Sequence, residues 1–178
     1  MKTEEIIALA KKEGFCNASV VSTEEIVFDA AFRPYCAENI CGQYGINYSC
    51  PPVCGTVDEM KNRVLAYKNA LVLQTKWEIE SFTDKEKLQM GKKLHNSATL
   101  RLMKQLREQG LDGFMVGAGG CSLCKPCLLG EGKPCKFPDL RYSCMSAYCI
   151  YVKKLAESCG MDYDYKNGIL FYFGMYVF

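Results

Sequence analysis

Cysteine is the residue type in this chain whose number and spacing point to chemistry, since 12 of the 178 residues are cysteine. Eight of them fall within two short segments, residues 33–55 and 117–138. Thiolates bind zinc and iron–sulfur clusters, and thiols pair as disulfides in oxidising compartments. The spacing within each segment therefore has to distinguish metal binding from disulfides and from simple packing.

The second segment carries the more regular pattern, C-x2-C-x2-C with one further cysteine: Cys121, Cys124, Cys127 and Cys135. Three cysteines at this spacing form a turn around one compact cluster, and a later cysteine supplies the fourth ligand. The pattern therefore favours a 4Fe-4S cluster. Zinc is the alternative, because four thiolates also make a tetrahedral zinc site.

The run Gly117-Ala118-Gly119-Gly120 precedes this segment directly. Glycine lets backbone N–H groups approach closely, and such groups donate hydrogen bonds to cluster sulfides. The alternative interpretation of the run is a plain turn between a strand and a loop.

The first segment is less regular, with the pattern C-x4-C-x8-C-x3-C at Cys36, Cys41, Cys50 and Cys54. This spacing matches no standard zinc or ferredoxin motif. The loop has no hydrophobic periodicity, however, and four cysteines in such a loop are not required for packing. We therefore predict a second metal site here, with an iron–sulfur cluster favoured over zinc.

The other four cysteines stand alone in the sequence. Cys16, Cys149 and Cys159 are expected in the core, where cysteine behaves as a small apolar residue. Cys144 is either a reserve ligand or a reactive thiol. His95, the only histidine, is predicted to be solvated or half-buried on a helix. A single histidine argues against cysteine-hydrolase chemistry, which needs a base beside the nucleophile.

Composition excludes several partners. The net charge of +2, from 22 basic and 20 acidic residues, is too balanced for a nucleic-acid or membrane surface. No apolar run approaches the roughly 20 residues that span a bilayer, and the first residues predict an amphipathic helix and not a signal peptide. We therefore expect a cytoplasmic protein, in which thiols stay reduced and disulfides are disfavoured.

The segments between the cysteines predict one domain, residues 1–178, of the α/β (or α+β) class with a small central sheet covered by helices. Capping signals and periodicity predict helices over residues 3–14, 57–67, 84–110 and 140–158. Strands are predicted over residues 16–22, 70–77, 113–120 and 168–178, with 26–30 a further strand or a turn.

Two of the predicted helices are expected to bury particular side chains. Capping boxes are expected at Thr56 with Glu59 and at Thr83 with Glu86. The inward face of the helix after Thr83 is expected to carry Leu88, Leu94, Ala98, Leu102 and Leu106. The inward stripe of the last helix is expected to carry Met145, Tyr148, Cys149, Val152, Leu155, Ala156 and Cys159.

Taken together, these segments resemble a family of small predicted metal-binding proteins of unknown function, found mostly in anaerobic bacteria and archaea. The resemblance rests on FRPYCAENICGQYGINYSCPP, VLAYKNALVLQ, GAGGCSLCKPC with PCKFPDLR, and FYFG. It implies ligands at Cys36, Cys41 and Cys50 and at all four cysteines of the second segment. In the family a small residue is usual in place of Cys54, serine in place of Cys144 and glycine more often in place of Cys149.

Three functions are compatible with this pattern. The first is an electron carrier or redox adaptor with one or two 4Fe-4S clusters and a redox protein as partner. The second is an enzyme whose first cluster has three thiolates and one open iron, which would bind a small-molecule substrate. The third is a structural or regulatory zinc module. The candidate pocket groups for the enzyme are Tyr44, Asn47, Tyr48, Arg33 and Arg141.

Overall fold

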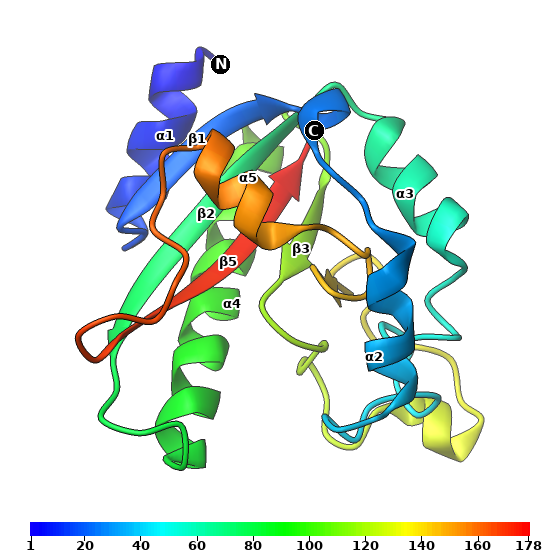
Figure 1. Cartoon of the computed structure of the whole chain (residues 1–178). Helices are drawn as coiled ribbons and strands as arrows, with labels where there is room; N and C mark the ends of the chain where they lie inside the picture. The colour runs from blue at the N-terminus through cyan, green and yellow to red at the C-terminus, as the bar shows by residue number, and fades with distance from the viewer.

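The computed structural model describes residues 1–178 as a five-stranded sheet with helices on both faces (Figure 1). The strand order is β1-β2-β5-β3-β4, and neighbours are antiparallel except for β3 and β4. The predicted α/β class, with a small sheet covered by helices, is confirmed. The strands are β1 (Asn17–Ser22), β2 (Asn69–Glu78), β3 (Phe114–Gly117), β4 (Ser143–Cys144) and β5 (Ile169–Val177).

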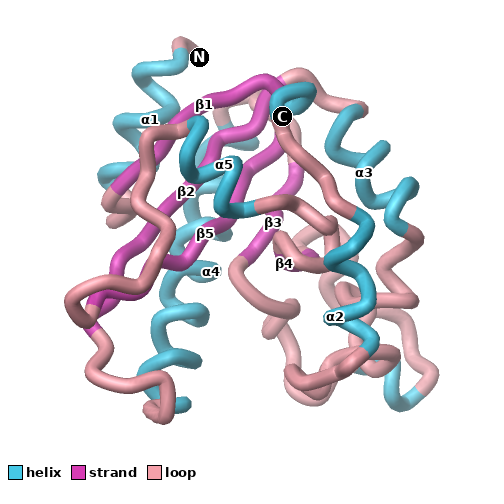
Figure 2. Tube along the Cα trace, viewed as in Figure 1, coloured by secondary structure: helices cyan, strands magenta, loops and turns pink.

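The helices divide between the two faces of the sheet. One buried apolar cluster joins the sheet to α1 and α4, and a second joins it to α3 and α5. Figure 2 shows α4 and α5 on opposite sides of the strands. None of the helices is both long enough and apolar enough to cross a membrane. The helices are α1 (Thr3–Lys12), α2 (Arg33–Ala37), α3 (Val57–Leu65), α4 (Lys85–Glu108) and α5 (Val152–Ser158).

Strand β2 runs through the middle of the core and is buried on both faces. Ala70 and Val72 belong to the cluster under α3 and α5, whereas Leu71 and Leu73 belong to the cluster under α1 and α4. This alternation follows from the strand itself, because successive side chains point to opposite faces. The strand predicted over residues 70–77 is therefore confirmed.

Helix α3 begins as predicted, and helix α4 does not. The hydroxyl of Thr56 accepts a hydrogen bond from the Glu59 backbone N–H at 3.2 Å, and the Glu59 carboxylate accepts from the Thr56 N–H at 2.8 Å. At α4 the cap is instead Asp84, whose carboxylate accepts from the Lys87 N–H at 2.9 Å. The predicted capping box at Thr83 is therefore wrong.

The face of α4 that packs on the sheet also differs from the prediction. Leu94 is 46% exposed, whereas the neighbouring His95 and Asn96 are buried. His95 Nδ1 lies 2.9 Å from the Thr75 hydroxyl, and the Asn96 amide donates to the Ala118 carbonyl at 2.9 Å. Polar side chains occupy this face because the sheet offers them hydrogen-bond partners. The predictions of an inward Leu94 and of a solvated or half-buried His95 are both wrong.

The helix predicted over residues 140–158 is present only in its second half, as α5. Before it the chain forms β4, which pairs with β3 through Gly117 and Cys144, and then a turn. Cys149 in that turn has φ 55°, a left-handed conformation that a right-handed helix does not contain. Met145 and Tyr148 are buried as predicted, although in a turn. Residues 26–30 likewise form only one bridge, between Phe28 and Ile150.

The two cysteine segments lie side by side beyond β3, where Figure 1 shows α2 and the yellow loop together. The Tyr48 hydroxyl donates a hydrogen bond to the Lys133 carbonyl at 2.9 Å. The Asn47 side-chain amide donates to the Cys121 carbonyl at 3.1 Å. Segments about seventy residues apart in the sequence therefore form one continuous region.

Candidate metal centre

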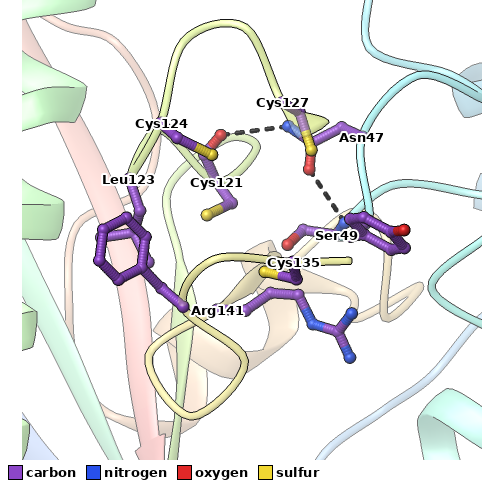
Figure 3. Close-up of a pocket in the computed structure, with 10 residues that line it drawn as sticks. Asn47, Ser49, Cys121, Leu123, Cys124, Cys127, Cys135 and Arg141 are labelled. Carbon is purple, nitrogen blue, oxygen red and sulfur yellow. Dashed lines mark hydrogen bonds between the residues drawn. The ribbon is translucent and has the colours of Figure 1, made fainter. Parts of the chain in front are cut away.

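All four cysteines of the second segment line one pocket. Figure 3 shows their sulfur atoms around the space between the two segments. No histidine or carboxylate lines this pocket, so thiols are its only metal-binding groups. The lining residues are Cys121, Cys124, Cys127 and Cys135, with Leu123, Phe137 and Arg141, and with Asn47, Tyr48 and Ser49 of the first segment.

The start of the second segment is held firmly by α4 and the sheet. The Asn96 side chain accepts a hydrogen bond from the Ala118 N–H at 2.8 Å and donates to the Ala118 carbonyl at 2.9 Å. A Cβ at Gly117 would lie 2.5 Å from the Tyr142 ring, so only glycine fits there. Gly119 has φ 81°, which turns the chain out of β3. The contacts of the glycine run thus fix the position of Cys121.

The first segment closes the other side of the pocket. Asn47 contacts Cys121 through the hydrogen bond already described, and it also accepts from the Ser49 N–H at 3.0 Å. The Arg141 guanidinium lies 5.8 Å from the centre of the Tyr48 ring, a cation–π distance. These contacts hold the pocket wall in place from both segments.

The Ser49 hydroxyl is the polar group in this wall that lacks a partner. Ser49 is 1% exposed, and its Oγ makes no hydrogen bond within the protein. A buried polar group left unpaired costs about 1–3 kcal/mol. A thiolate or sulfide in the pocket would accept its hydrogen bond, so the residues present fit a sulfur-rich, negatively charged group.

Three cysteines of the first segment line another cavity, a larger cleft of about 620 Å³. Cys36 comes from α2, Cys41 from the loop after it, and Cys50 is buried. The fourth cysteine of this cleft is Cys144, at the end of β4. Cys54 does not line it and packs instead in the apolar cluster under α3 and α5.

Burial makes the Cys36 and Cys50 thiols of this cleft weak acids. Burial, followed by the neighbouring Cys144 thiol, raises the pKa of Cys50 to about 12 and that of Cys36 to about 11. All twelve cysteines are free thiols and none forms a disulfide. The Cys36 and Cys50 thiols are thus protonated at neutral pH, and a bound metal would displace their protons.

Neither cysteine set forms a close-fitting site for one ion. Nowhere do three cysteine, histidine or carboxylate side chains converge closely enough to bind a single metal ion.

The candidate pocket groups are divided between the two sites. Asn47, Tyr48 and Arg141 line the pocket of the second segment, and Tyr44 lines the larger cleft. Arg33 lines neither and donates to the Ala147 carbonyl at 3.0 Å.

Sequence reasoning missed Ser49, although its position next to Cys50 was a signal. It treated Cys144 as either a reserve ligand or a reactive thiol, because no cysteine pattern includes that position.

The fold and the two thiol-lined cavities define a cysteine-rich, metal-binding α/β protein. The family model described as Predicted metal-binding protein (DUF2284) matches residues 19–178. Because the match covers most of the chain, the protein belongs to this family, and the resemblance seen in the sequence is confirmed. No curated protein and no solved structure is significantly similar to it.

Proposed function

We propose that the protein is an iron–sulfur electron carrier or redox adaptor. One 4Fe-4S cluster is carried by Cys121, Cys124, Cys127 and Cys135, and a second lies at the first cysteine segment. The single observation that carries the proposal is the pocket of the second segment, in which thiols are the only metal-binding groups and the buried Ser49 hydroxyl has no partner.

Sulfur spacing supports a cluster over zinc. Zinc holds four ligands at about 2.0–2.3 Å from one ion, so its donors must nearly touch a common point. No three donor side chains of this chain do so. A cuboidal cluster has its four irons at separate corners, and each thiolate binds its own iron. Three cysteines at three-residue steps with a fourth further along suit a cluster, whereas zinc sites usually have two separated pairs.

Charge and hydrogen-bond donors also suit a cluster. Four thiolates and the sulfides make a net negative group, and Arg141 places a cation in the pocket wall. The Ala118 N–H of the glycine run already donates to Asn96, whereas the N–H groups of Gly119 and Gly120, next to Cys121, are available to sulfur. Neither pocket is lined by a carboxylate that would repel an anionic cluster.

Electron transfer is supported by how near the two cysteine sets are to each other. Ser49 lines the pocket of the second segment, and the next residue, Cys50, lines the larger cleft. Likewise, Gly120 lines the larger cleft and the next residue, Cys121, lines the pocket. Two clusters in these cavities are thus separated by little more than one layer of backbone. Electron transfer between centres slows steeply with distance, so adjacent clusters favour a carrier.

The experiment is to purify the protein without oxygen and to measure iron, acid-labile sulfide and zinc per chain. Two clusters give about eight irons and eight sulfides with a broad absorbance near about 400 nm, and one cluster gives about four of each. Electron paramagnetic resonance (EPR) after dithionite reduction then tests whether the clusters accept electrons. A colourless protein with zinc and no sulfide would refute the proposal in favour of the zinc module.

An enzyme with an open iron is the second candidate, and the size of the larger cleft is the observation that favours it. A cavity of about 620 Å³ lies within the range typical of small-molecule sites. With only Cys36, Cys41 and Cys50 as ligands, one iron would be free to bind a substrate there. The two candidates therefore differ in whether a fourth thiolate completes this site.

A further inference from the structure

We infer that Cys144, and not Cys54, is the fourth thiolate of the first site, where it joins Cys36, Cys41 and Cys50 around a 4Fe-4S cluster. The kind of metal centre rests on the proposed function, whereas the choice of ligands rests on the geometry of the cleft. The first segment in the sequence thus supplies three ligands, and the fourth comes from a strand about ninety residues later.

The strongest support is the shared cleft, which is lined by all four of these cysteines and by no histidine or carboxylate. Two of them flank the same stretch of backbone. Cys144 is the β-sheet partner of Gly117 on β3. A Cβ at Gly120 would lie 3.3 Å from the Cys50 sulfur, so that sulfur rests against the end of the same glycine run.

Cys54 lies outside this cleft. It is 7% exposed and belongs to the apolar cluster that also contains Met60 and Tyr148. The Gly55 carbonyl lies 4.0 Å from its sulfur, and the Arg33 side chain also lies close to it. Cys144 packs against the same apolar cluster, so lining the cleft, and not the polarity of the surroundings, distinguishes the two cysteines. Cys54 therefore acts as a packing residue at the start of α3.

Hydrogen-bond donors lie beside Cys144 as they do beside cluster ligands. The Ala147 backbone N–H donates to the Cys144 sulfur at 3.4 Å. Donors to a ligand sulfur stabilise the thiolate and tune the cluster. The neighbouring cysteine, Cys149, does not line the cleft, so it offers a matched control in the same turn.

Arg33 supplies a positive charge that the protein leaves incompletely paired. It lies on α2 one turn before Cys36, and its Nη2 donates to the Ala147 carbonyl in the turn that follows Cys144. Its Nε is buried without a partner. Arg33 thus connects the elements that carry Cys36 and Cys144, and among the four proposed ligands its cation lies near Cys36.

Four thiolates leave no iron with an open position. The first site then serves electron transfer, and the open-iron enzyme is excluded at this site. If Cys144 is not a ligand, the three remaining cysteines leave one iron free.

The test compares Cys144→Ala with Cys54→Ala and Cys149→Ala, all prepared without oxygen. Iron, acid-labile sulfide and the EPR spectrum after dithionite reduction are measured for each. We expect the parent and both controls to hold about eight irons per chain, and Cys144→Ala to fall toward about four or to show an altered EPR spectrum. Cys144→Ser, which keeps the size and an acceptor for the Ala147 N–H, replaces Cys144→Ala if that variant does not fold.

Two results would overturn the inference. One is a Cys144 variant whose iron content and EPR spectrum match those of the parent. The other is a Cys54→Ala protein that loses the same signal as the Cys144 variant. An unmodified protein without iron and sulfide would instead refute the proposed function, so the two failures are distinguishable.

Discussion

The side-chain amide of Asn47 donates a hydrogen bond to the backbone carbonyl of Cys121 at 3.1 Å and thereby joins the two cysteine segments. Asn47 is 4% exposed, and its side chain also accepts from the Ser49 N–H and contacts Gln43. One residue of the first segment therefore positions the first cysteine of the second. The two cysteine sets are coupled through this residue.

Replacing Asn47 should weaken that coupling and the fold. Asn47→Ala leaves the Cys121 carbonyl and the Ser49 N–H unpaired, so we expect the free energy of unfolding to fall by about 2 kcal/mol. Urea unfolding under anaerobic conditions measures the change. Asn62→Ala, on the exposed side of α3, is the matched control and should stay within about 0.5 kcal/mol of the parent. Equal stability of the two variants would contradict the prediction.

Removing a ligand from the second segment should remove a whole cluster. Cys124→Ala is expected to lose about four irons per chain, because the remaining three thiolates and the loop are ordered by the metal. Its unfolding free energy should fall as well. Cys159→Ala, outside both cavities, should keep its iron. Unchanged iron in Cys124→Ala would count directly against a cluster at this pocket.

Gly120 should matter to the first site, although it belongs to the second segment. A Cβ there would lie 3.3 Å from the Cys50 sulfur, whereas a Cβ at Gly130 would meet nothing within 4 Å. Neither glycine has a positive φ, so alanine is allowed at both by the backbone. We expect Gly120→Ala to shift the first cluster's EPR signal or to lower its iron, and Gly130→Ala to resemble the parent. Identical spectra for all three proteins would show that Cys50 does not lie against this glycine.

His95 should make stability depend on pH between about 6.5 and 5. Burial lowers the pKa of His95 to about 3 from its ordinary 6.5. As the pH falls below 6.5, the unfolded chain binds a proton that the folded protein does not. The contribution of His95 to the free energy of unfolding is therefore fully present above pH 6.5. It is lost on acidification by up to about 1.4 kcal/mol per pH unit.

The measurement for His95 is the unfolding free energy at several pH values from 7 to 5. His95→Gln removes the only histidine and should flatten the slope in this range. The carboxyl groups of Glu13 and Glu59, whose pKa values are lowered below 4.5, act only at lower pH. A slope that persists unchanged in His95→Gln would refute the assignment of this pH dependence to His95.

Local sequence signals predicted the elements of this fold that a short run of consecutive residues marks. The capping box at Thr56 and the apolar run of β2 are both present where expected, although β2 is held in the sheet by β1 and β5. The helix predicted before residue 152 is absent because β4 pairs with β3 over a long sequence separation. Met145 and Tyr148 of this segment are buried, and they give the same hydrophobic periodicity in a turn as they would in a helix.

The same distinction applies to the candidate site. The C-x2-C-x2-C pattern is local, and its four cysteines do line one pocket. The set of cysteines in the larger cleft is not local in sequence, because Cys144 reaches the cleft only through the pairing of β4 with β3. Sequence proximity suggested Cys54, yet the start of α3 turns its side chain into the core. No spacing rule connects residues brought together by sheet topology.

Ser49 should affect the reduction potential of the second-segment cluster more than the assembly of that cluster. Its buried hydroxyl has no partner in the protein chain and lines the pocket. A hydroxyl that donates to a cluster sulfur stabilises the more negative, reduced state. A hydrogen bond of about 1 kcal/mol corresponds to roughly 40 mV for one electron.

We therefore expect Ser49→Ala to keep its iron and to have a potential roughly 40 mV more negative, measured by EPR-monitored redox titration. The iron-free Ser49→Ala protein should instead be more stable than the iron-free parent, because an unpaired buried hydroxyl has been removed. Ser158→Ala, on α5, is the control for both measurements. An unchanged potential together with a destabilised iron-free protein would mean that the Ser49 hydroxyl serves the fold and not the cluster.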